Sequence, residues 1–538
     1  MTNNWKYLLF MATAFPTAAA FAQTGDAGRR AVDLERYQEA KSYYKTQLGD
    51  KKADNAYFAL GDIYLKTDKP DSAAFYFNQG LSKNSKSAIN MVGLGKVQLE
   101  NGNKAEAEKN FEQALKASKK KDPYVLTMIA EAYAESANPT EEDLNKAIEY
   151  LQAATKRDKN NALAFLVMGD VYLKQKKGGE AMTSYDRAIQ LDEKNPKAYL
   201  RRGQLYTSSR NYNEAEAAYK KAIEIDPNYA PAYRDLGELY YFAGQYDRAL
   251  STFKQYVDMS EKTPETRAKY ASFLFLTKDY KNTLTEVQEV LKEDPNNTTM
   301  NRLLAYSYLE LGQPEQALQA METYLSKIDP SKLIATDYEY YGRILSKNNQ
   351  PEKAVENLNK AIELDPSKPE LYYELANAYA NAKQFDKAAD VYKAKMDKLG
   401  SSNTDFYQMG RTYMKAEQYQ KADESFSKIT ESNPTYAYGH LWRAQANAYQ
   451  DQTGEKGLAK PHYEKFIELA SAEPAKYKDG LVEAHNYLGQ YYYVIKPDRA
   501  NATKNFQETL KLDPSNETAN TLLAEINKSA STSKKKKK

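Results

Sequence analysis

The 538-residue chain contains no cysteine and only three histidines. Without cysteine it has no disulfide framework, and no lipid-modified cysteine can follow a leader sequence. His440, His462 and His485 stand far apart and lack the paired spacing of a zinc site. The sequence also has no Gly-rich phosphate loop and no nucleophile elbow. These absences argue against an enzyme, and we predict no catalytic residue, no cofactor and no metal site.

Long apolar runs are also scarce. The first 22 residues carry one cation, Lys6, then the apolar run Tyr7–Phe15 and a tail of small residues that ends at Ala22. This order is typical of a secretory signal peptide, and we expect cleavage before Gln23. Elsewhere no run approaches the roughly 18 apolar residues of a membrane-spanning helix, so no transmembrane span is expected. The mature chain is expected in the periplasm, with outer-membrane association or secretion as alternatives.

Positive and negative side chains are nearly equal in number. The formal net charge of +3 includes Lys6 and the terminal lysines Lys534–Lys538, so the rest of the chain is slightly acidic. This balance gives no indication of the basic face that nucleic-acid binding needs, and we expect no nucleic-acid partner. The terminal lysines are expected either to contact anionic surfaces weakly or to act only as a solubilising end.

The sequence is rich in self-similarity. The stretch Pro196–Val257 overlays on itself at an offset of 34 residues. Matching residue classes fall at Tyr199 and Tyr233, Gly203 and Gly237, Ala215 and Ala249, and Tyr219 and Phe253. A fixed period of this size indicates stacked units rather than one globular core.

Within this stretch, one unit has the pattern of a helical hairpin. Apolar residues follow helical spacing up to the polar loop 208–211, and again from 213 to 225. The second helix is expected to stop at Asp226-Pro227, because the residue before a proline is disfavoured in the α region. The small residues Gly203, Ala215 and Ala222 let the two helices approach closely.

These residues resemble the tetratricopeptide repeat. The repeat has a large residue, Leu-Gly and Tyr in its first helix, then Ala and an aromatic residue in its second. In this chain the matching positions are Tyr233, Leu236-Gly237, Tyr240, Ala249 and Phe253, while Tyr256 replaces a small residue. The resemblance implies an all-α, right-handed superhelical solenoid of helix-turn-helix repeats.

About thirteen units are expected. Their starts are predicted near Asp54, Ala88, Pro123, Ala162, Pro196, Ala230, Pro264, Thr298, Ala335, Pro369, Asn403, Ala437 and Val482. Extra residues are placed around 138–143 and 451–456, with one more before Ala502. The predicted organisation is a signal peptide (1–22), an N-terminal lead with a capping helix at Val32–Leu48 (23–53), the solenoid (54–515), a C-terminal capping helix (516–528) and a disordered Lys-rich tail (529–538).

The resemblance also implies a binding groove along the first helices, which takes an extended peptide or a partner helix. Tyr and Arg are the residues that dominate binding hot spots. The predicted groove residues are Arg234, Glu238, Tyr241, Arg302, Tyr306, Glu339, Arg343, Tyr373, Asn377, Tyr407, Arg411, Leu441, Gln445, Asn486, Gln490 and Tyr493. An alternative for Arg234 and Glu238 is that they only pair with each other across one helical turn.

We therefore expect a non-enzymatic interaction scaffold or adaptor that binds another protein in the cell envelope of a Gram-negative bacterium. One alternative is an envelope assembly or wall-associated factor that binds glycan or anionic polymer. Another is an enzyme with an unrecognised carboxylate site.

Overall fold

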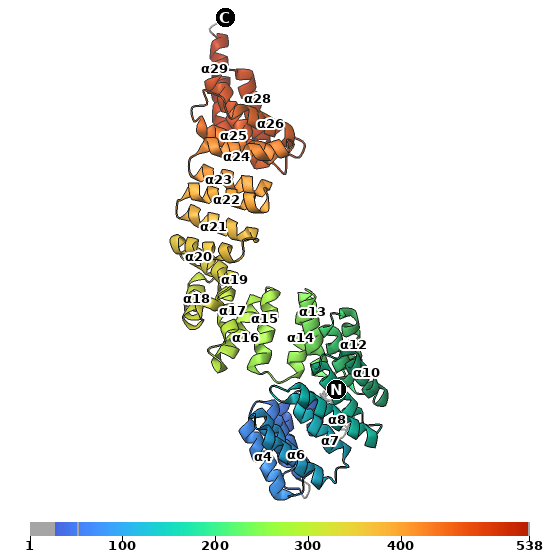
Figure 1. Ribbon diagram of the computed structural model, residues 1–538. Helices are drawn as coiled ribbons and strands as arrows, with labels where there is room; N and C mark the ends of the chain where they lie inside the picture. The colour runs from blue at the N-terminus through green and yellow to red at the C-terminus, as the bar shows by residue number, and fades with distance from the viewer. Residues whose placement is uncertain (1–26, 51–52, 536–538) are drawn as a thin grey trace, which may run out of the picture. The chain divides into compact units, whose positions relative to one another are not determined.

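The computed structural model describes residues 27–50 and 53–535, with side chains described up to 528 (Figure 1). In these residues every regular element is helical, and no helix is long and apolar enough to cross a membrane. The predicted signal peptide lies outside the described residues. The chain divides into two compact units, Met1–Leu303 and Leu304–Lys538, and the division falls inside α17 (Thr298–Glu310).

Unit 1 consists of consecutive helices joined by short turns. They are α1 (Ala27–Asp33), α2 (Tyr37–Thr46), α3 (Asp54–Lys66), α4 (Pro70–Lys83), α5 (Ala88–Glu100), α6 (Lys104–Ala117), α7 (Pro123–Glu135), α8 (Glu141–Arg157), α9 (Ala162–Lys174), α10 (Gly178–Leu191), α11 (Pro196–Ser208), α12 (Tyr212–Ile225), α13 (Ala230–Phe242), α14 (Tyr246–Met259), α15 (Pro264–Leu276) and α16 (Tyr280–Glu293).

Unit 2 continues the same pattern after α17. Its helices are α18 (Pro314–Lys327), α19 (Ala335–Lys347), α20 (Pro351–Leu364), α21 (Pro369–Asn381), α22 (Phe385–Leu399), α23 (Asn403–Lys415), α24 (Tyr419–Ser432), α25 (Ala437–Gln450), α26 (Lys460–Ala470), α27 (Lys478–Gln490), α28 (Arg499–Leu512) and α29 (Glu517–Lys535).

The hairpin register agrees closely with the sequence prediction. From α3 to α16 and from α19 to α28 each odd-numbered helix packs on the next helix, and every predicted start but the last is the first residue of a helix. The exception is α27, which begins at Lys478 rather than Val482. The extra residue expected before Ala502 is taken up by a π-helical turn at Tyr491–Ile495. A π turn accommodates an inserted residue without ending the helix.

The turns inside the hairpins share one backbone feature. In most of them one residue adopts positive φ, which reverses the chain within a short connection. These residues are Asp68, Gly102, Lys176, Arg210, Gly244, Lys278, Gly312, Asn349, Lys383 and Glu417. Glu35, between α1 and α2, has φ 59° and belongs to the same series.

The N-terminal segment therefore differs from its prediction. The single helix expected at Val32–Leu48 is two helices, α1 and α2, joined by a turn at 34–36. Together they form a shortened hairpin, because α1 has 7 residues where α3 has 13. The prediction was wrong because the turn contains no Gly, Pro or Asn that would mark a helix end.

At the other end of the chain, α29 packs Ala519 and Ile526 against Ala502 and Phe506, which covers the last hairpin. The helix continues to Lys535, although the sequence suggested disorder from 529 onward. No Gly or Pro interrupts residues 529–535, and lysines at a helix C-terminus interact favourably with its dipole.

The core of each hairpin is the contact between its two helices. In the α11–α12 hairpin the Tyr219 ring, 1% exposed, lies against Gly203, and Ala215 is fully buried beside it. A Cβ atom placed on Gly203 would lie 2.5 Å from Cε1 of Tyr219. The two helices can approach this closely only because the position carries no side chain.

We predict that Gly203→Ala lowers the free energy of unfolding by about 1–3 kcal/mol, because the new methyl group overpacks the tyrosine ring. Urea denaturation followed by circular dichroism measures this change. The matched control is Gly179→Ala in α10, where a Cβ atom would meet nothing within 4 Å. That substitution should be neutral or slightly stabilising. Equal effects of both substitutions would show that the close contact is not required.

Candidate functional site: the inner surface of unit 1

The first helices of the hairpins in unit 1 surround a cavity of about 1000 Å³. Its walls come from α1, α2, α3, α5 and α7, with Leu163 of α9 and Lys197 of α11 at its edge. The floor contains apolar side chains such as Phe58, Val125 and Met128. Polar and charged side chains, among them Asn55 and Tyr124, line the remainder. The cavity therefore combines apolar contact area with groups that can orient a ligand.

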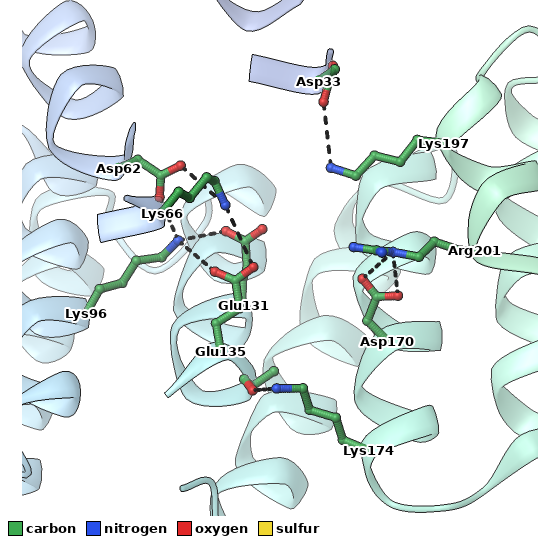
Figure 2. A network of polar contacts seen from close by, with 11 residues as sticks. Asp33, Asp62, Lys66, Lys96, Glu131, Glu135, Asp170, Lys174, Lys197 and Arg201 are labelled. Atoms are coloured by element: carbon green, nitrogen blue, oxygen red, sulfur yellow. Dashed lines mark hydrogen bonds and ion pairs between the residues drawn. The ribbon is translucent and has the colours of Figure 1, made fainter. Parts of the chain in front are cut away.

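A cluster of five charged side chains from α3, α5 and α7 lies at one side of this cavity (Figure 2). Lys96, which is 5% exposed, lies at its centre. Its Nζ is 3.0 Å from Asp62, 2.9 Å from Glu131 and 3.5 Å from Glu135. Lys66 lies 3.8 Å from Asp62 and 3.9 Å from Glu135. Three carboxylates thus share two ammonium groups.

The pKa values follow from this arrangement. Burial alone would raise the pKa of Asp62, but Lys66 and Lys96 outweigh burial and hold it below its usual range. Burial also opposes the charge on Lys96, yet the surrounding carboxylates raise its pKa well above the usual value. The pKa of Glu131 is lowered, because Lys96 and Lys66 together overcome its burial. Burial and the neighbouring Glu131 instead raise the pKa of Glu135.

A second group of polar contacts continues along α9 and α11 (Figure 2). Arg201 Nε lies 3.1 Å from Oδ1 of Asp170, and the Tyr185 hydroxyl donates to the same carboxylate at 2.7 Å. Lys197 Nζ lies 3.7 Å from Asp33, at the end of α1. Charged side chains of the inner surface are thus fixed by one another and present a defined pattern of charge.

The predicted groove residues of unit 1 are largely engaged within the chain. Arg234 binds Glu35 and Asp235, and Glu238 pairs with Lys269, so the proposed pairing of Arg234 with Glu238 is wrong. Tyr241 is exposed and its ring lies against Phe273. Arg302 is half-buried on α17.

In unit 2 several predicted residues also have partners in their own chain. The Tyr306 hydroxyl donates to Asp337 at 2.7 Å and its ring stacks on Tyr340. Arg343 lies 3.0 Å from Glu310. The other contacts join Glu339 to Lys368, Tyr373 to Asp405, Gln445 to Glu483, Asn486 to Asn516 and Tyr493 to Glu525.

Only some of the predicted groove residues in unit 2 are exposed to solvent. Asn377, Arg411 and Gln490 are exposed, and Leu441 is buried. The Tyr407 ring packs on Trp442, and the two ring centroids are 4.3 Å apart. The guanidinium of Arg411 lies 5.5 Å from the centroid of the Tyr407 ring. Tyr407 and Arg411 are predicted residues that the structure brings together.

The charged cluster of unit 1 was missed from the sequence. Asp62, Lys96, Glu131 and Asp170 each stand ninth in their hairpins, counted from Asp54, Ala88, Pro123 and Ala162. The predicted groove residue Glu238 is likewise ninth, counted from Ala230. The ninth position is thus a sequence signal for Asp62, Lys96 and Glu131, whereas Lys66 and Glu135 stand thirteenth and lack it.

Models of repeat families match the chain in several places. They are described as TPR repeat at 169–209 and 342–383, and as tetratricopeptide repeat at 26–88, 90–121, 196–229, 218–251 and 406–436. A model described as anaphase-promoting complex, cyclosome, subunit 3 matches 243–324. The match at 26–88 includes α1 and α2, in agreement with the extra hairpin in the structure.

Individual proteins show the same similarity. The antiviral innate immune response effector IFIT1 of Homo sapiens is 21% identical over 264 residues, which are 48% of this chain and 50% of that protein. The TPR repeat-containing protein MJ1428 of Methanocaldococcus jannaschii is 27% identical over 208 residues, 35% of each chain. The matched part of the chain thus spans half the length of the first of these curated relatives and about a third of the length of the second.

Among solved structures, the C-terminal part of a TPR repeat-containing protein from Cytophaga hutchinsonii is 35% identical. The similarity covers 47% of this chain and 97% of that one, with a TM-score of 0.43.

The fold and the inner surface define an all-α protein of stacked helical hairpins. The register and the family matches make the identification specific: the chain belongs to the tetratricopeptide repeat family.

We predict that Glu131→Gln and Glu135→Gln have different effects on stability. Glu131→Gln removes a carboxylate whose ionised form the lysines stabilise, so the free energy of unfolding should fall by about 1–3 kcal/mol. Glu135→Gln removes the surplus carboxylate, whose raised pKa shows that its charge is unfavourable. The midpoint of thermal unfolding of this variant should therefore stay unchanged or rise. Thermal unfolding at pH 7 measures both variants. Equal losses would contradict the assignment of Glu135 as the surplus charge.

Proposed function

We propose that the protein is a non-enzymatic scaffold whose unit 1 cavity binds an extended segment of a partner protein. The tetratricopeptide repeat fold supports a protein–protein interaction scaffold in general. The observation that carries the proposal is the cavity of about 1000 Å³ between the first helices of unit 1. The amides and the fixed charges of its lining suit recognition of a partner.

An extended peptide fits the chemistry of this lining. The apolar floor at Phe58, Val125 and Met128 provides contact area for side chains. Asn55 and Gln47 also line the cavity, and their amides can donate to and accept from a peptide backbone. The charged cluster carries one more carboxylate than ammonium groups, so it favours a partner segment with a basic residue.

Unit 2 offers a second surface of the kind expected from the sequence. Tyr407 with Arg411 and Trp442 forms a compact aromatic group, and Asn377 and Gln490 are exposed. We assign these residues an accessory role in holding the partner, since rings and guanidinium groups make strong contacts at interfaces.

A crosslinking experiment in the producing cell tests the cavity. A photoreactive amino acid at Asn55, which is exposed and lines the cavity, should form an adduct with a protein on irradiation. The same amino acid at Lys109, 67% exposed on α6 and outside the cavity lining, is the matched control and should give none. Adducts at Lys109 alone would move the binding surface out of the cavity. Recovery of a glycan or anionic polymer at Asn55 would favour the wall-associated alternative instead.

The proposed place of action is the periplasm, since the apolar run Tyr7–Phe15 and the small-residue tail at Ala22 are typical of an exported chain. We predict that the protein purified from its native cell begins at Gln23. N-terminal sequencing of that protein measures this directly. A mature chain that still begins at Met1 would contradict export by cleavage. Contact of Lys534–Lys538 with anionic surfaces remains part of the same proposal.

A further inference from the structure

The turn between α1 and α2 lies against helices that are far away in the sequence. The Glu35 carboxylate accepts hydrogen bonds from Arg234 of α13 at 2.6 Å and from the Tyr256 hydroxyl of α14 at 3.3 Å. Arg36 Nε donates to the Met259 carbonyl at 2.9 Å. Stacked repeats normally contact only their neighbours, so these contacts across unit 1 need an explanation.

The other polar contacts of the α1–α2 hairpin include ion pairs in which the hairpin supplies first a cation and then an anion. Arg30 of α1 pairs with Asp226, at the end of α12, and Asp33 pairs with Lys197 of α11. The backbone N–H of Gln38 donates to the Glu261 carboxylate. We call the surface formed by Lys197, Asp226, Arg234, Tyr256 and Glu261 the turn-binding surface. Its cations face the acidic groups of the turn, and its carboxylates face a guanidinium and a backbone donor.

An apolar contact accompanies this charge pattern. Leu34, at the tip of the turn, is only 5% exposed and belongs to the same buried cluster as Leu200 and Tyr229 of α11–α13. Other apolar residues of the hairpin, such as Ala31 and Tyr44, pack instead on Leu60 of α3. The hairpin thus contacts its neighbour on one side and the turn-binding surface on the other.

The segment also bounds the candidate site. Arg29, Val32 and Asp33 of α1, with Tyr44 of α2, line the cavity of unit 1. The N-terminal hairpin is therefore both a wall of that cavity and the occupant of the turn-binding surface. Movement of the hairpin away from this surface would open the cavity along one side.

We propose that the turn-binding surface is a receptor for an apolar–acidic turn, that Leu34-Glu35 occupies it within the chain, and that a partner turn of the same chemistry competes for it. The charge complementarity of the two sides and the burial of Leu34 support this assignment. Only the consequence for partner entry into the cavity rests on the proposed function; the receptor itself does not.

Competition within one chain has a measurable consequence. A segment tethered to its receptor acts at an effective concentration of about millimolar, so it excludes a dilute free peptide. A chain whose own turn is released should therefore bind the free peptide more tightly, because a larger fraction of the receptor is vacant.

The test uses a fluorescent peptide of residues 27–46 and the full-length chain. Glu35→Arg places a cation against Arg234 and releases the turn, and Leu34→Ser is a second variant that removes the apolar contact. Faster hydrogen exchange at residues 27–46 than in the wild-type chain reports release. We expect each released chain to bind the peptide with a Kd at least tenfold lower than the wild-type chain does.

Two matched controls isolate the receptor. The Glu35→Arg peptide should not bind the released chains, because it lacks the carboxylate that Arg234 holds. The released chain that also carries Arg234→Ala should lose binding of the wild-type peptide. Circular dichroism establishes that each variant keeps its helix content.

Three results would overturn the proposal. The first is equal affinity of the wild-type and released chains for the peptide. The second is absence of peptide binding to a chain whose residues 27–46 exchange rapidly. The third is unchanged exchange in both variants, since the named contacts would then not hold the turn. None of these outcomes depends on a partner in the cavity, so failure here and failure at Asn55 can be told apart.

Discussion

Many of the hairpins depend on a close contact between their two helices, in which a large side chain of the second helix lies over a small residue of the first. The pairs include Gly61 with Phe77, Gly95 with Phe111, Gly169 with Tyr185, Gly203 with Tyr219, Gly410 with Phe426 and Gly489 with Phe506. Because the ring occupies the space that a Cβ atom would need, the spacing of the two helices is fixed within each of these hairpins. Constant spacing keeps the first helices aligned, and their side chains then form one inner surface in unit 1.

The hairpins could be predicted from the sequence because their signals are local. The small residues recur with a period of 34, and Pro or Asp-Pro marks many helix ends, as at Pro196 and Pro227. The turn at 34–36 carries no such signal, so the sequence predicts one helix where the structure has a hairpin. Contacts between residues such as Glu35 and Arg234 have no local signature, since either charge alone is typical of a solvated helix face. Long-range pairing decides which predicted groove residues are available to a ligand.

The buried charges on the inner surface of unit 1 affect both the stability of the fold and the positions of the charges that a ligand would meet. Buried ion pairs such as Lys96 with Glu131 contribute little net stability, because the loss of hydration opposes their attraction. They do fix the positions of charges, since each side chain has few alternative partners at such depth. A pattern of fixed charges discriminates among peptides by placing like charges against the wrong ones. In the function proposed above, the charged cluster therefore suits selectivity between partners better than it suits stabilisation of the fold.

The docking of the first hairpin on α11–α14 also sets an order of events during synthesis. Arg36 leaves the ribosome long before its acceptor on Met259, which lies 223 residues further along the chain. At about 5–20 residues per second, the interval is about 10–45 s. For most of that time Leu34 lacks Leu200 and Tyr229, which finally cover it, while the hairpins between are already able to stack. Closure of unit 1 is thus a late step, and a nascent chain that stops before residue 261 retains an N-terminal hairpin with its docking surface incomplete.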